Sequence, residues 1–145
     1  MSARLIEAYY SAFNAGDWAA MLACLTEDVA HDINQGLSET GREAFGAFLT
    51  RMERCYRERV EELVVMVSAD GHRAAAEFVI HGAYLTADEG LPPATGQSYV
   101  LPVGAFFELR DSRIARVTNH YNLEDWLRQV RGPSAPAGAG QSPAI

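Results

Sequence analysis

The first part of the chain places apolar residues at the three- and four-residue spacing of amphipathic helices. One helix is predicted to end at Asn14-Ala15-Gly16, and its apolar face is Leu5, Ile6, Tyr9, Tyr10 and Phe13. Asp17 can cap a second helix that ends at Thr26-Glu27-Asp28, and its inward stripe is Trp18, Met21, Leu22 and Leu25. A third helix is predicted after Gly41, with the apolar face Phe45, Phe48, Leu49, Met52 and Tyr56. We expect the first two helices to form a hairpin.

The third predicted helix also carries a run of charged side chains, which are Arg51, Glu53, Arg54, Arg57 and Glu58. Opposite charges four residues apart on a helix form weak ion pairs in solvent. We interpret the run as a solvated helix face, with an anion-binding patch as the alternative.

From about residue 60 the hydrophobic period changes to two and β-branched residues multiply, which indicates a sheet. Four strands are predicted, over Val60–Ser68, Arg73–Thr86, Tyr99–Arg110 and Arg113–Leu123. Tight turns at Asp70-Gly71 and Arg110-Asp111-Ser112 make the sheet an antiparallel meander. A brief strand over Val29–Asn34 leads into a loop at Gln35-Gly36. Helices followed by long strands predict an α+β domain whose helices cover one face of a strongly bent sheet.

A chain of 145 residues suits one domain, which we place at residues 1–131, with a disordered tail rich in Gly, Pro, Ala and Ser at 132–145. The net charge of −7 argues against nucleic acid and anionic membranes as partners. The sequence shows no leader and no apolar run near the roughly 20 residues that span a bilayer. We therefore expect a cytoplasmic protein, with Cys24 and Cys55 reduced.

Candidate chemistry lies where polar residues face the interior of the domain. Asp32, with Asn34 two residues later, lies in the brief strand beside apolar segments. A carboxylate against apolar walls has a raised pKa and can act as a general base, whereas the alternative is that both residues only cap the turn. Tyr9 and Tyr10 can donate a hydrogen bond to a substrate oxygen or can simply belong to the core.

Strand alternation leaves the orientation of two further sets of polar residues open. Glu77 and His81 share one face of their strand, opposite Phe78 and Ile80. On the last strand, one face carries Val117, Asn119 and Tyr121 and the other carries Thr118, His120 and Asn122. The spacing of the His, Asp and Glu residues matches no metal motif, and no phosphate or dinucleotide motif occurs, so we expect neither a metal nor a cofactor.

Several motifs resemble the SnoaL-like, ketosteroid isomerase-related branch of the nuclear transport factor two-like superfamily. They are Phe13-Asn14-Ala15-Gly16-Asp17 after Tyr9, Leu25-Thr26-Glu27-Asp28-Val29, His31-Asp32-Ile33-Asn34-Gln35-Gly36 before Gly41-Arg42-Glu43, and Arg113-Ile114-Ala115-Arg116-Val117. The resemblance covers about residues 4 to 130. It implies a cone-shaped, cystatin-like fold around a pocket for a small hydrophobic molecule, and a homodimer paired through the open face of the sheet.

The resemblance also implies roles for particular residues. Asp32 matches the catalytic aspartate when the register is set from Gly41-Arg42-Glu43 and is off by one when it is set from Asp17. Tyr9 matches the tyrosine that donates to the substrate oxyanion. The substrate-binding positions are then Tyr10, Trp18, Asn34, Glu77, His81, Asn119 and Tyr121. Where the steroid isomerases have a protonated aspartate as second oxyanion donor, this sequence has Gly104 or Ala105.

The leading functional hypothesis is an isomerase or cyclase in which Asp32 takes a proton from a hydrophobic carbonyl compound while Tyr9 stabilises the enolate. One alternative is a ligand-binding or dimerising module of the same fold without chemistry. A dehydratase is another, and an epoxide hydrolase is a third that needs a second carboxylate beside Asp32, for which Glu77 is the candidate.

Overall fold

The computed structural model describes residues 2–34 and 36–131. The described residues form four helices and six strands, in the order α1 (Ser2–Ala15), α2 (Trp18–Ala23), β1 (Leu25–Ile33), β2 (Leu37–Thr40), α3 (Arg42–Cys55), β3 (Tyr56–Val67), β4 (Arg73–Tyr84), β5 (Gln97–Arg110), β6 (Arg113–Tyr121) and α4 (Leu123–Arg131). The predicted tail at 132–145 and Gln35 of the predicted loop lie outside the described residues.

The six strands make one sheet in the order β2-β1-β6-β5-β4-β3. The meander from β3 to β6 is antiparallel throughout, as the turn residues predict. However, β1 pairs with β6 in parallel, so the prediction of an antiparallel sheet is wrong for this pair of strands. Parallel neighbours need a long connection, and here everything from β2 to β5 lies between them in the sequence.

Several elements differ from their predicted form. The second helix stops at Ala23, and Leu25 together with Thr26-Glu27-Asp28 belongs to β1 instead. Part of the predicted loop is the short strand β2. Helix α4 was not predicted, because the last strand was extended to Leu123 and the buried face of α4 has only the three apolar residues Trp126, Leu127 and Val130.

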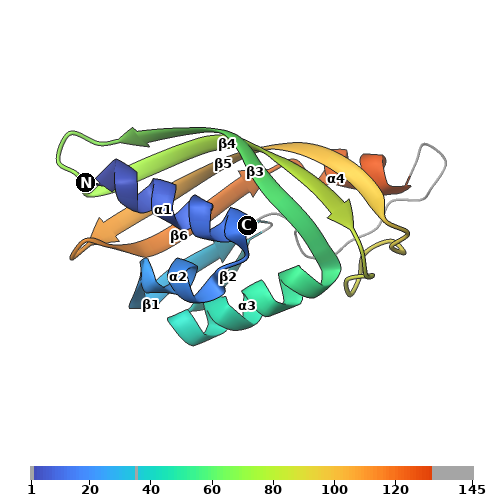
Figure 1. Cartoon of the computed structure of the whole chain (residues 1–145), viewed down its shortest axis with the longest axis horizontal. Coiled ribbons are helices and arrows are strands. Elements are labelled where there is room, and N and C mark those ends of the chain that lie inside the picture. Colours follow the sequence, from blue (N-terminus) through green and yellow to red (C-terminus); the bar gives the residue numbers. More distant parts are fainter. Residues whose placement is uncertain (1, 35, 132–145) are drawn as a thin grey trace.

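The sheet bends around α1, which crosses its concave face (Figure 1). Helix α1 packs mainly on β3, α3 packs on β1 and β2, and α4 packs on β5. Irregular pairing bends the strands: the β3–β4 register shifts between Glu61 and Val64, and the β5–β6 register shifts between Glu108 and Leu109. Bulges of this kind increase local twist and curvature. The fold is thus the predicted α+β architecture with a strongly bent sheet.

The structure decides which strand faces point inward. On β4 the alternate residues Ala74, Ala76, Phe78, Ile80 and Tyr84 are buried against the helices. On β6 the buried residues are Ile114, Val117 and Asn119. The opposite face of the sheet carries Glu77, His81, Phe106 and His120, which are exposed.

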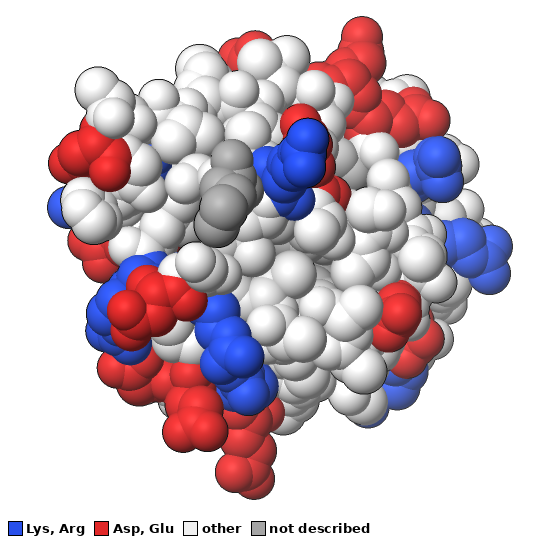
Figure 2. Space-filling model, turned by 60° about the vertical axis from the view of Figure 1, so that its left-hand side comes forward, with Lys and Arg blue, Asp and Glu red and all other residues white. Residues whose placement is uncertain are grey.

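Figure 2 shows one face of the molecule, on which basic and acidic side chains are interspersed around an uncharged centre. Within residues 2–34 and 36–131, no helix is both long and apolar enough to cross a membrane.

Candidate functional site

Four inward-facing polar side chains each have at least one buried atom without a hydrogen-bond partner in the described part of the chain. They are Tyr9 and Tyr10 on α1, His31 on β1 and Asn119 on β6, and each is at most 2% exposed. The unpartnered atoms are both tyrosine hydroxyls, His31 Nε2 and both amide atoms of Asn119. A buried polar group left unsatisfied costs about 1–3 kcal/mol, so such a concentration marks a place where a ligand or water supplies the missing bonds.

His31 points inward because β1 alternates, with Val29, His31 and Ile33 all on the buried face. Its ring stacks on Phe45 at a centroid distance of 4.3 Å and meets the edge of Phe48 at 4.7 Å. Nδ1 lies 3.3 Å from Glu39 Oε1. Burial lowers the pKa of His31 from 6.5 to about 4, so the imidazole is neutral near pH 7. With its proton on Nδ1 toward Glu39, the ring presents Nε2 to the interior as an acceptor.

Asp32 lies on the opposite face of β1, which corrects the expectation of a base in an apolar pocket. Its carboxylate accepts hydrogen bonds from Ser38 Oγ at 3.0 Å and Thr118 Oγ1 at 2.7 Å, and Arg116 Nη1 lies 3.5 Å away. Burial alone would raise the pKa of Asp32, but these hydrogen bonds outweigh it and the net shift is downward. The predicted upward shift is therefore wrong, because a shift of one residue along a strand exchanges its two faces.

Glu77 and His81 also lie on the outer face, so the expectation that they face the pocket is wrong. The ring of His81 pairs with Glu61 of β3, with 3.0 Å between Nε2 and Oε2. Glu77 faces Gly104 across the β4–β5 ladder. Two strands, β6 and β5, separate β1 from β4, so Glu77 does not pair with Asp32 as the epoxide hydrolase alternative requires.

A cavity of about 390 Å³ opens where α1 ends and β3 begins. Its lining includes Phe13, Trp18, Met52, Tyr56, Glu58 and Leu85. A volume of this size holds a small ligand, and the wall combines these apolar side chains with the polar or charged side chains of Asn14, Glu53, Arg57 and Glu58. Trp18 is the predicted substrate-binding residue that contributes to this wall.

Two glutamates line this cavity, the exposed Glu53 and the less exposed Glu58, and both were predicted to lie on a solvated helix face. Glu58 instead lies on β3, where Tyr56, Glu58 and Val60 alternate inward. The Tyr99 hydroxyl donates to Glu58 Oε2 at 2.7 Å, while Oε1 is buried without a partner among the described residues. Burial raises the pKa of Glu58 from 4.5 to about 8, and the Tyr99 hydrogen bond opposes that rise. The apolar alternation of Tyr56 and Val60 was the sequence signal that could have revealed this residue.

Contacts among aromatic side chains hold the Glu58–Tyr99 pair in place. The Tyr99 ring contacts Trp126 of α4 at a centroid distance of 5.9 Å. Tyr56 stacks on Tyr84 at 5.4 Å, and its hydroxyl donates to Asp88 at 2.8 Å. These contacts leave the pair little freedom to turn away from the cavity.

The remaining predicted positions lie near the ends of β1 and β6. Asn34 donates from Nδ2 to the backbone oxygen of Tyr121 at 3.1 Å and so ties these strand ends together. Tyr121 is half-buried. At the position where the resemblance implies an oxyanion donor, Ala105 is fully buried and Gly104 faces outward, so neither side chain can donate.

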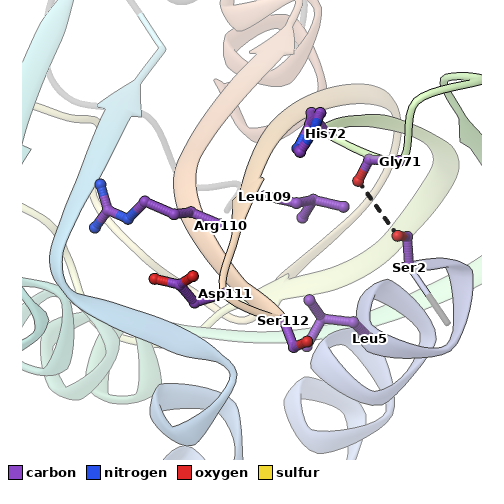
Figure 3. Close-up of a pocket in the computed structure, with 8 residues that line it drawn as sticks. All are labelled: Ser2, Leu5, Gly71, His72, Leu109, Arg110, Asp111 and Ser112. Atoms are coloured by element: carbon purple, nitrogen blue, oxygen red, sulfur yellow. Dashed lines mark hydrogen bonds between the residues drawn. The ribbon is translucent and has the colours of Figure 1, made fainter.

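A second cavity, of about 360 Å³, lies at the other end of α1 beside the β3–β4 and β5–β6 hairpins (Figure 3). Ser2 Oγ donates to the backbone oxygen of Gly71 there, at 3.4 Å. The predicted site residues are not part of its lining. Among the described residues, no group of three His, Cys, Asp or Glu side chains could hold a metal ion.

The chain is similar to known proteins both in sequence and in structure. A family model for the SnoaL-like domain matches residues 6–117. A crystal structure of a candidate polyketide cyclase from Pseudomonas putida KT2440 is 61% identical, with a TM-score of 0.88, over 90% of this chain and 98% of that one. A crystal structure of a candidate polyketide cyclase from Xanthomonas campestris pv. campestris is 58% identical, with a TM-score of 0.86, over 88% of this chain and 95% of that one.

A more distant NTF2-like protein from Burkholderia xenovorans LB400 is 15% identical, with a TM-score of 0.73, over 90% of this chain and 95% of that one, and it shares the fold. No curated protein matches the chain.

Proposed function

The chain belongs to the SnoaL-like domain family of the NTF2-like superfamily, and we propose that it is a cyclase- or isomerase-type enzyme that moves a proton on a small hydrophobic carbonyl compound. Solved relatives at 51–61% identity that are named as candidate polyketide cyclases support this reaction class. The unpartnered polar groups of the interior support a carbonyl compound as the ligand, because its oxygen can take up one of the missing hydrogen bonds.

His31 takes the role that the sequence analysis gave to Asp32. The single observation that carries this assignment is the buried Nε2 of His31, which faces the interior without a partner among the described residues. A neutral imidazole can accept a proton from carbon, and the Glu39 carboxylate beside Nδ1 stabilises the imidazolium that forms. Removing the base leaves the substrate without a proton acceptor.

Tyr9 and Asn119 have groups that can hold the carbonyl oxygen and orient the compound. Both are buried on the concave side, on α1 and β6 respectively. Burial raises the pKa of Tyr9, so its phenol keeps its proton and serves as a hydrogen-bond donor.

The test is exchange of the α-protons of 2-tetralone, a bicyclic ketone, followed in deuterium oxide by proton NMR. We expect His31→Gln to lower the exchange rate at least about 100-fold, since a positioned general base contributes 10²–10⁴-fold. His120→Gln is the matched control, because His120 lies on the outer face of β6 and is exposed. Unchanged exchange in His31→Gln would refute this assignment.

A second candidate function is a ligand-binding module without catalysis. The observation that favours it is the outward position of Asp32, whose carboxylate is already held by Ser38 and Thr118. Under this alternative, wild-type protein binds the ketone and leaves its rate of proton exchange equal to that in buffer.

A further inference from the structure

We propose that the cavity between the end of α1 and the start of β3 is a second ligand site, which binds an α-amino acid with an apolar side chain. This site is separate from the interior site of the proposed function, because His31, Tyr9 and Asn119 are not among the described residues that line it. Binding here does not depend on the proton transfer proposed for His31. The ligand that the cavity fits is a zwitterion, with one ammonium group, one carboxylate and an apolar body.

The apolar part of the wall fits an aromatic or aliphatic side chain. Phe13 and Trp18 lie next to each other, with 6.0 Å between their ring centroids and 47° between their planes. Met52 and Leu85 are also part of the lining. Leu85 is 39% exposed and Trp18 is partly exposed, so a bound side chain covers apolar surface that water otherwise meets. The volume of about 390 Å³ is in the range of small-ligand sites.

Several polar groups of the lining are already engaged or shielded. The side-chain amide of Asn14 both donates to and accepts from the backbone of β3. Oε2 of Glu58 accepts from the Tyr99 hydroxyl, and Oε1 of Glu58 is shielded from solvent. The Tyr56 hydroxyl donates to Asp88. These side chains therefore shape the cavity and are not the main groups that bind a ligand in it.

Two exposed side chains of opposite charge remain in the lining, Glu53 near the end of α3 and Arg57 near the start of β3. Neither forms an ion pair with another residue that the structure describes. Glu58 adds no charge near neutral pH, because burial raises its pKa to about 8. The lining thus presents one positive and one negative charge to a ligand.

This pair of charges selects the class of ligand. A singly charged anion would be attracted by Arg57 and repelled by Glu53, and a cation would meet the reverse. A neutral apolar compound would use neither charge. An α-amino acid can present its carboxylate to Arg57, in the charge-assisted hydrogen bonds that guanidinium groups form, and its ammonium group to Glu53. Its side chain then faces the apolar wall.

The test is the binding of L-phenylalanine to the full chain at neutral pH, followed by tryptophan fluorescence. Trp18 lines the cavity, whereas Trp126 is fully buried in the core, so the signal reports on Trp18. We expect 2-phenylethylamine, which lacks the carboxylate, and 3-phenylpropionate, which lacks the ammonium group, to bind about 3- to 10-fold more weakly, since each loses one partly solvated charge pair. Glycine should bind at least about 10-fold more weakly, because it has no side chain to bury.

Two variants assign the charges of the ligand to their partners. Arg57→Gln should bind L-phenylalanine no more tightly than 2-phenylethylamine, because the carboxylate has lost its partner. Glu53→Gln should likewise bind L-phenylalanine no more tightly than 3-phenylpropionate. The matched controls are Arg54→Gln and Glu43→Gln, which remove the same charges at exposed positions of α3 outside the lining. Both controls should keep their affinity for L-phenylalanine within about twofold of wild type.

Absence of L-phenylalanine binding, or equal affinity for L-phenylalanine and both single-charge analogues, would overturn the inference. So would an equal loss of affinity in Arg57→Gln and Arg54→Gln, or a fluorescence change that persists in Trp18→Phe. The exchange of 2-tetralone protons should be the same in Arg57→Gln as in wild type, because His31 is not part of this lining. Loss of that exchange in Arg57→Gln would refute the separation of the two sites.

Discussion

At the scale of single residues, Gly82 supports the Glu58–Tyr99 pair through its lack of a side chain. A Cβ atom at position 82 would lie 2.3 Å from Cζ of Tyr99 and 2.6 Å from its hydroxyl oxygen. The Tyr99 ring cannot easily yield, since Glu58 holds its hydroxyl and Trp126 packs against the ring. The backbone of β4 is therefore part of the site.

We predict that Gly82→Ala lowers the free energy of unfolding by about 1–3 kcal/mol, because overpacking displaces the buried ring. Urea denaturation measures the change. Gly104→Ala is the matched control: Gly104 lies on the adjacent strand with no atom within 4 Å of an added Cβ. Equal stability of the two variants would show that Tyr99 moves without cost.

His31 should make stability depend on pH. Its pKa is about 4 in the folded protein and 6.5 when unperturbed, so between these values the unfolded chain binds the extra proton. The contribution of the neutral His31 side chain to the free energy of unfolding is therefore present above pH 6.5 and is lost as the pH falls toward 4. We predict that His31→Gln flattens this part of the curve of unfolding free energy against pH, measured by urea titrations. A wild-type curve with the same slope as the variant would contradict the buried, neutral imidazole.

At the scale of elements, Asn14 connects the end of α1 to β3. Its Nδ2 donates to the Val60 backbone oxygen at 2.9 Å, and its Oδ1 accepts from the Val60 backbone N–H at 2.8 Å. Because Val60 lies two residues beyond Glu58 on the same face, this pair of bonds holds α1 against the strand that carries the cavity carboxyl.

We predict that Asn14→Ala lowers the free energy of unfolding by about 1–3 kcal/mol, since it leaves two β3 backbone groups unpaired. It should also raise the mobility of β3, which hydrogen exchange at Val60 measures. The control is Ser11→Ala, an exposed position on the same helix. Unchanged exchange at Val60 would mean that packing alone holds α1 in place.

The change from α3 to β3 explains why Glu58 was misassigned. Helix α3 ends at Cys55, and Tyr56 already has extended backbone angles, so no loop separates helix from strand. A helix-to-strand boundary without Gly or Pro has no local signal, and the charged residues on both sides looked like one helix face. The packing of Tyr56 and Val60 on the core decides where the strand begins.

At the scale of the whole molecule, the outer face of the sheet exposes a group of apolar side chains. Val64, Met66, Val100 and Phe106 are each about half exposed, at 49–51%. A shallow groove of about 350 Å³ runs along this face beside Met66 and Phe106. Exposed apolar patches on a sheet favour association, and we propose that this face pairs two copies of the chain.

We predict that Phe106→Glu converts a dimer into a monomer, because a charge in the centre of the patch cannot be buried without a partner. Analytical ultracentrifugation measures the mass. Thr50→Glu, on the exposed side of α3, is the control. A wild-type protein that sediments as a monomer would refute the proposed pairing.

The sequence by itself determined the class and order of the main elements. The hydrophobic periodicity was sufficient to predict α1, α3 and the meander from β3 to β6, because each has a long amphipathic pattern between clear turn residues. The same patterns placed Tyr9, Tyr10 and Asn119 among residues that could face the interior, and the structure buries all three.

Only the tertiary structure decided which strand faces point inward and which polar side chains the fold buries. Alternation divides a strand into two faces but does not say which one meets the core. The family resemblance implied that Asp32, Glu77 and His81 face the pocket, and all three lie on the outer face. The parallel pairing of β1 with β6 joins segments far apart in sequence and has no local signal. Long-range packing turned His31 and Glu58 inward, because burying one face of a bent sheet fixes every side chain on it.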